Sequence, residues 1–170
     1  MITVLGEDSD GREACFEANR DSRVDCARMG SFAVAVGGEP SVLYTIGADT
    51  CTIIAIACPG QRYALGHFDG SLLGIHGAGI YEVAVRKMLD QLEAEHAEHI
   101  VLSGANDGAG NDAAIAAAVA GFGPVTWCRP EAEDWYDKGY LFTRERTLAL
   151  YMWMEDDQPS LRTTGRTFPY

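Results

Sequence analysis

The sequence predicts an α+β fold, a β-sandwich-like core of mixed sheet flanked by two helices. Short apolar, β-branched runs separated by turn residues occupy residues 31–68. The apolar spacing then changes to a helical period near residue 81. Beyond residue 99, strand-like and helix-like stretches alternate. Because strands and helices are both present and neither a repeat nor a low-complexity linker interrupts them, an α+β class is expected.

The strands expected in the first half come in four runs: 31–36, 41–46, 51–57 and 62–68. Glycines end the first two runs, which favours turns there. The last two runs flank Cys58-Pro59-Gly60, a three-residue loop whose glycine suits the left-handed position of a hairpin turn. These two runs are therefore predicted to pair as a β-hairpin.

Two helices are expected in the second half of the chain. Residues 81–98 place apolar side chains on one helical stripe, namely Tyr81, Val85, Met88, Leu89 and Leu92. Residues 113–120 are alanine-rich, with Asn111 or Asp112 as the expected cap and Gly121 as the end. Strands are expected at 99–104 and 124–128, and β-like pieces occur at 139–143 and 148–154.

The domain prediction is one thiol amidohydrolase-like domain over residues 1–170, with its core at 31–128. Segments 1–30 and 129–170 are left unassigned. The net charge of −12 disfavours unspecific binding to nucleic acid or to an anionic membrane. No stretch of signal-peptide or membrane-spanning character is found. The five scattered cysteines favour a reduced, cytoplasmic setting, and delivery by a signal-less secretion route stays open.

The predicted hairpin brings a cysteine and a histidine together. If it is symmetric about Pro59, Cys51 lies directly opposite His67. Opposed residues have Cβ atoms about 4.5–5.5 Å apart and share a face, so the imidazole can accept the thiol proton. A slip in register is the alternative to this geometry. Cys51 can also be a small apolar core residue with no chemistry.

Four neighbours complete the candidate site. Thr45, six residues before Cys51, can receive the other ring N–H of His67 and fix its orientation. Backbone amides of Asp49, Thr50 and Cys51 can form an oxyanion hole. Asp69 can orient His67 or hold a substrate amine, but Asp-Gly is also ordinary turn chemistry, and the turn interpretation is slightly favoured.

These motifs resemble the cysteine amidohydrolase superfamily, which includes chemoreceptor glutamine deamidases, the catalytic domain of cytotoxic necrotizing factors and protein N-terminal asparagine amidohydrolases. The similar stretches are "YTIGADTCTIIAI", "ALGHFDG" and "IVLSGANDGAGND", within residues 44–122. In the chemotaxis enzymes a Thr stands six residues before the Cys and a His follows it by about 16 or 17. Thr45, Cys51 and His67 keep that spacing.

The resemblance implies a deamidase-like fold and hydrolysis of a side-chain amide in a protein Gln or Asn. Cys51 is then the nucleophile and His67 the general base, and neither a metal nor an organic cofactor is required. The partner is a protein substrate, endogenous or foreign. Two alternatives stay open: a Cys–His peptidase or acyltransferase, and a non-catalytic protein-binding domain on the same scaffold.

Other polar stretches have weaker interpretations. His96 and His99, with Glu95 and Glu98, can bind a divalent metal, but such residues more often complement the C-terminal dipole of a helix. The Gly-rich 104–112 segment lacks a phosphate-binding fingerprint and is expected to be a loop. Trp135 and Tyr136 can dock a partner or pack under a charged turn. His76 is the backup base if the hairpin register differs.

Overall fold

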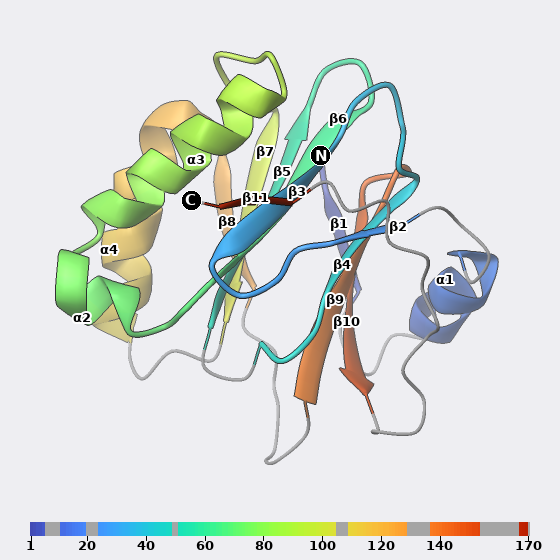
Figure 1. Ribbon diagram of the computed structural model, residues 1–170, viewed down its shortest axis with the longest axis horizontal. Coiled ribbons are helices and arrows are strands. Elements are labelled where there is room, and N and C mark those ends of the chain that lie inside the picture. The colour runs from blue at the N-terminus through green and yellow to red at the C-terminus, as the bar shows by residue number, and fades with distance from the viewer. Residues whose placement is uncertain are drawn as a thin grey trace.

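Two β-sheets stacked face to face, with helices outside them, form the protein, and the predicted α+β class is confirmed (Figure 1). The computed structural model describes residues 1–5, 11–19, 24–48, 51–104, 109–128, 137–153 and 167–169. All statements below concern these residues. Asp49, Thr50 and residues 105–108 of the predicted 104–112 loop lie outside them, as do Trp135 and Tyr136.

The larger sheet has six strands. In spatial order they are β11 (Thr167–Pro169), β3 (Ser31–Ala35), β6 (Arg62–Phe68), β5 (Thr52–Cys58), β7 (His99–Gly104) and β8 (Val125–Cys128). Only β7 and β8 pair in parallel. Every residue of β5 is buried, because one face of this strand packs on helices and the other on the second sheet. This double burial explains the uninterrupted apolar run from which β5 was predicted.

The smaller sheet has five strands. They are β1 (Thr3–Leu5), β10 (Thr147–Trp153), β9 (Asp137–Thr143), β4 (Val42–Thr45) and β2 (Val24–Cys26). All except β4 come from segments 1–30 and 129–170, so these segments complete the sandwich instead of extending it. β1 and β2 are three residues long; β1 pairs in parallel with β10, far along the chain, and β2 pairs in parallel with β4, with β3 between them in sequence. Such short strands carry too little periodicity to be predicted from sequence.

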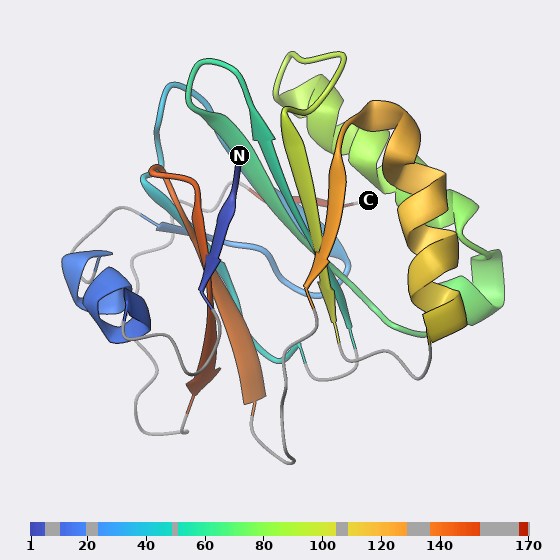
Figure 2. The same cartoon turned by 180° about the vertical axis from the view of Figure 1, so that it is seen from behind.

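The helices lie on both outer faces of the sandwich (Figures 1 and 2). On the six-stranded sheet are α2 (Leu72–His76), α3 (Gly79–Gln91) and α4 (Ala109–Val119), which continues as the 3₁₀ turn η1 (Ala120–Phe122). The helix α1 (Gly11–Asn19) lies on the other side, where Cys15 packs against the outer face of the five-stranded sheet. The two predicted helices correspond to α3 and α4.

Both predicted helices differ from the structure at one end. The α3 helix ends at Gln91 rather than near residue 98, in a Schellman motif in which the Ala94 N–H donates to the Leu89 carbonyl. Glu93 holds the left-handed position of this motif with φ 51°, a place where glycine is usual, which is why the end was missed. The α4 helix begins at Ala109, so the predicted caps Asn111 and Asp112 lie inside its first turns.

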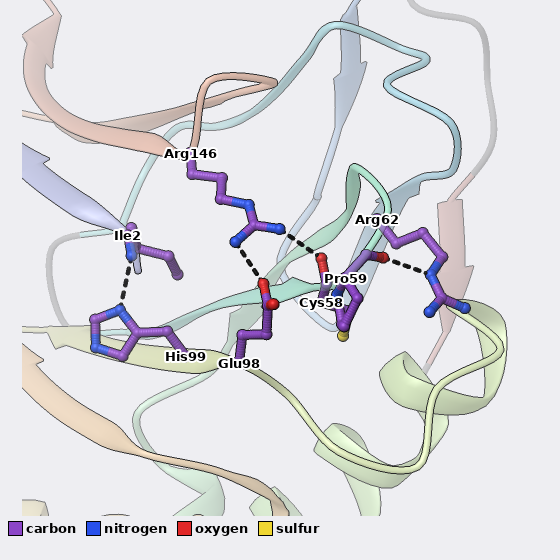
Figure 3. A network of polar contacts seen from close by, with 7 residues as sticks. All are labelled: Ile2, Cys58, Pro59, Arg62, Glu98, His99 and Arg146. Atoms are coloured by element: carbon purple, nitrogen blue, oxygen red, sulfur yellow. Dashed lines mark hydrogen bonds and ion pairs between the residues drawn. The ribbon is translucent and has the colours of Figure 1, made fainter.

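A polar network joins the two sheets where β5 ends (Figure 3). Arg146, in the turn between β9 and β10, donates to the Glu98 carboxylate and to the Cys58 carbonyl. The His99 ring accepts the Ile2 N–H at Nδ1 (2.8 Å), and its Nε2 lies 2.8 Å from Thr126 Oγ1. Because Ile2 is a backbone donor, Nδ1 carries no proton and Nε2–H donates to Thr126. His99 therefore ties the N-terminal segment to β7 and β8.

The interpretation of residues 95–99 as the C-terminal turn of a helix is corrected by this arrangement. His99 begins β7 and His96 is exposed beyond the end of α3, so neither lies in the last turn of that helix. Both ring nitrogens of His99 are already engaged in hydrogen bonds. Within the described ranges, no cluster of three or more His, Cys, Asp or Glu side chains is arranged to hold a metal.

His99 is expected to make the protein less stable in mild acid. Burial, and secondarily the N-terminal amino group, lower the pKa of His99 from its ordinary 6.5. The unfolded chain therefore binds this proton more readily, and the free energy of unfolding decreases as pH falls below about 6.5. Urea unfolding at pH 7.5 and 5.5 measures the effect. His99→Asn should lose less stability over this interval than wild type; an equal or larger loss contradicts the prediction.

Candidate functional site

The β5–β6 hairpin has a different register from the predicted one. Cys58 pairs with Arg62 and Ile53 pairs with His67, so the loop is centred on Gly60 instead of Pro59. Gly60 and Gln61 both adopt left-handed backbone angles (φ 75° and 55°), which moves the loop one residue along the chain. The predicted direct opposition of Cys51 and His67 is therefore wrong, because Ile53 occupies that place.

The shift is compatible with the prediction that Cys51 and His67 share a face of the sheet. Moving the pairing by two residues preserves the face, because side chains alternate with a period of two. Cys51 directly precedes β5 and lies two residues from Ile53, which points into the core between the sheets. Continued alternation from Ile53 to Cys51 would make Cys51 a diagonal neighbour of His67, a relation that in sheets generally spans roughly 7–8 Å between Cα atoms. Both side chains are buried, with 4% and 1% exposure.

His67 is held by a hydrogen bond that crosses the sandwich. Its Nδ1 lies 2.6 Å from the Thr45 hydroxyl, which β4 of the other sheet supplies. This is the contact predicted from the sequence, made through the Thr45 side chain. The second ring nitrogen, Nε2, is buried and has no hydrogen-bond partner among the described residues. The ring is thus fixed at one nitrogen and has the other available for proton transfer.

The environment of His67 favours a neutral imidazole. Burial lowers the pKa of His67 below its ordinary value, and the Asp69 carboxylate and the Ala27 backbone oppose this only in part. A neutral imidazole can accept a proton from a neighbouring thiol, whereas a charged one cannot. The electrostatics of this position therefore suit a general base.

A second hydrogen bond crosses the sandwich beside the first. Ile53 pairs with His67 on one side and with Ser103 of β7 on the other, and Thr45 pairs with Tyr140 of β9. The Ser103 hydroxyl lies 2.7 Å from the Tyr140 hydroxyl. Sequence analysis missed this pair; the only available signal was a serine inside an otherwise apolar strand.

Met29 contacts the candidate nucleophile. The Cys51 Sγ lies 4.0 Å from the Met29 Sδ, and Met29 is itself 61% exposed. Met29 belongs to the turn between β2 and β3, within the segment that sequence analysis left unassigned. The Met-Gly step in this turn was its only sequence signal.

The remaining candidate residues do not join the His67–Thr45 pair in the described structure. The Asp69 carboxylate accepts the Ser71 N–H (2.8 Å), a turn contact, and the Ser71 hydrogen bonds lower the pKa of Asp69. This agrees with the turn interpretation. His76 is exposed at the end of α2, in the helical layer on the other face of the sheet. The predicted oxyanion residues Asp49 and Thr50 fall in the part of the chain that the structure does not describe.

All five cysteines are thiols. Cys58 lies at the opposite end of β5 from Cys51 and points toward the helices. Burial raises the pKa of Cys58 to about 11, which makes it an unreactive internal reference for the chemistry of Cys51.

Comparisons with known proteins leave the family open. A scan against protein-family models matched no family, and a search of curated proteins gave no significant match. In the part of the chain that was searched, none of the helices has the length and apolar character needed to span a membrane. A functional proposal therefore depends on the residues of the site.

Proposed function

We propose that the protein is a cysteine-dependent amidohydrolase that converts the side-chain amide of a protein Gln or Asn to a carboxylate and releases ammonia. The observation that carries the proposal is the state of His67, which is buried, lies with Nδ1 2.6 Å from the Thr45 hydroxyl, and has no partner for Nε2 among the described residues. Cys51, His67 and Thr45 then act as the nucleophile, the general base and the group that orients the base. The resemblance of residues 44–122 to cysteine amidohydrolases supports the same chemistry.

The proposed reaction has two steps. With Nδ1–H donated to Thr45, His67 Nε2 accepts the Cys51 proton, and the sulfur attacks the amide carbon. The protonated Nε2 then gives its proton to the leaving nitrogen, so ammonia departs and a thioester remains. Next, His67 removes a proton from water, the hydroxide attacks the thioester, and the carboxylic acid leaves as the thiol is restored. One water is consumed for each ammonia released.

The two alternatives share parts of this site. A peptidase or an acyltransferase would use the same attack by Cys51, but with a backbone amide as substrate or an amine as acceptor. A binding domain would contain Cys51 as an inert core residue. The products and the reactivity of Cys51 distinguish these possibilities.

The decisive experiment is mass spectrometry of candidate proteins incubated with wild type or Cys51→Ser. The proposal expects an intact substrate in which one side-chain amide has become an acid, with ammonia released, only with wild type. Chain cleavage would indicate a peptidase, and an amine adduct would indicate a transferase. If Cys51 also reacts with iodoacetamide no faster than Cys58, the protein is not a thiol enzyme.

A further inference from the structure

Met29 places an exposed side chain against a buried thiol. Met29 is 61% exposed, whereas the Cys51 that it contacts through sulfur is 4% exposed. A substrate must reach the nucleophile, so the Met29 side chain that covers Cys51 has to move when substrate binds. His67 Nε2, which is buried and lacks a hydrogen-bond partner within the described part of the chain, marks this as a reactive region and not a lone cysteine.

The backbone around Met29 is fixed to the two strands that carry the histidine and the threonine. The Gly30 N–H donates to the His67 carbonyl (2.8 Å), and the Ala27 N–H donates to the Tyr44 carbonyl (2.8 Å), one residue before Thr45. The turn itself is closed by Ser31, whose N–H and hydroxyl both donate to the Arg28 carbonyl (2.9 and 2.7 Å). Gly30 takes φ 82°, as position three of a type II turn requires.

With the turn backbone anchored, the adaptable part is the Met29 side chain. It is unbranched, has three rotatable bonds and ends in a polarizable thioether that contacts varied apolar surfaces. Moving it off Cys51 loses apolar contact, which an apolar group of the incoming substrate can replace. A free amino acid would instead bring its charged ammonium and carboxylate to this spot, where they would lose hydration.

We propose that Met29 is a specificity-determining residue that covers Cys51 and admits a Gln or Asn whose neighbouring residue in a protein chain is apolar. This inference rests on the proposed function, and it names the substrate class: amides in a polypeptide next to an apolar side chain, in preference to free glutamine or asparagine.

The cover is tested first through thiol reactivity, which needs no substrate. Cys51 alkylation by iodoacetamide and by the bulkier N-ethylmaleimide is followed by peptide mapping in wild type, Met29→Ala, Met29→Leu and Val36→Ala. Val36 is an exposed apolar residue elsewhere and serves as the matched control. Met29→Ala should accelerate alkylation severalfold, more for the bulkier reagent, and Met29→Leu should resemble wild type. Equal rates in Met29→Ala and Val36→Ala would overturn the cover.

Specificity is tested by protection of Cys51 from iodoacetamide. Two synthetic peptides differ only in a Leu or a Ser beside the Gln, and free glutamine is the third probe. The Leu peptide should protect best in wild type, and its advantage should vanish in Met29→Ala. Equal or absent protection would overturn the specificity role. If the cover and the protection are observed but no peptide is deamidated, the proposed function fails while Met29 still governs access.

Discussion

Replacing His67 with alanine is expected to reduce amide hydrolysis by about 10²- to 10⁴-fold, the usual contribution of a general acid–base residue. His67 Nε2 is buried and has no hydrogen-bond partner among the described residues, and the proposed reaction uses it to move a proton in both steps. Without it, the proposed reaction has no group to accept the Cys51 proton, and ammonia lacks an acid to assist its departure. The loss should fall mainly on kcat, because the ring acts on the reacting atoms.

The matched control is His99→Asn. His99 is also a buried histidine with a lowered pKa, but it lies across from Ala57, toward the opposite end of β5 from Cys51. Its replacement should leave hydrolysis within a few-fold of wild type. The pH profile of Cys51 alkylation adds an independent readout, since its inflection in wild type should be displaced in His67→Ala and unchanged in His99→Asn. Hydrolysis by His67→Ala at a rate close to that of His99→Asn would remove His67 from the mechanism.

The strands between residues 31 and 68 were predictable because their signals are local. Each run between residues 31 and 68 is bounded by turn residues and corresponds to one of β3 to β6. The hairpin register was not predictable, because it depends on which loop residues take left-handed angles, and Gln61 shares this role with Gly60. The end of α3 was missed for the same reason, since Glu93 occupies a position typical of glycine.

The site was predictable only in part, and the predicted residues are those that lie in recognisable strand runs. Thr45 and His67 belong to the runs 41–46 and 62–68, and their contact is present. Met29, Ser103 and Tyr140 were missed, because each reaches this region through pairing that no local pattern encodes. Tyr140 belongs to β9 of the five-stranded sheet, whose other strands come from residues 3–5, 24–26, 42–45 and 147–153. A sandwich assembles its interior from both sheets, so most of what the second sheet contributes to this region comes from segments far from the nucleophile in sequence.

Thr45→Val is expected to show whether the Thr45–His67 hydrogen bond only joins the two sheets or also orients the catalytic base. Valine keeps the shape of threonine but removes the hydroxyl, so His67 loses its described hydrogen bond at Nδ1. Nε2 already has no partner among the described residues, so neither ring nitrogen would then have one there. A buried polar group left unsatisfied costs about 1–3 kcal/mol. If a free energy of this size is lost from the transition state because the ring is no longer oriented, kcat falls roughly 10- to 100-fold. Thr45→Ser restores a hydroxyl and should recover most of the activity.

Thr143→Val provides the comparison for this experiment. Thr143 is equally buried, lies on β9 beside β4, and its hydroxyl accepts the Thr147 N–H instead of contacting the histidine. Both valine variants should lower the free energy of unfolding in urea, but only Thr45→Val should lower kcat and shift the pH dependence of Cys51 alkylation. If the two variants lose stability alike and both keep wild-type turnover, the Thr45–His67 bond only joins the sheets. A selective loss of kcat that Thr45→Ser reverses would mean that the second sheet orients the base.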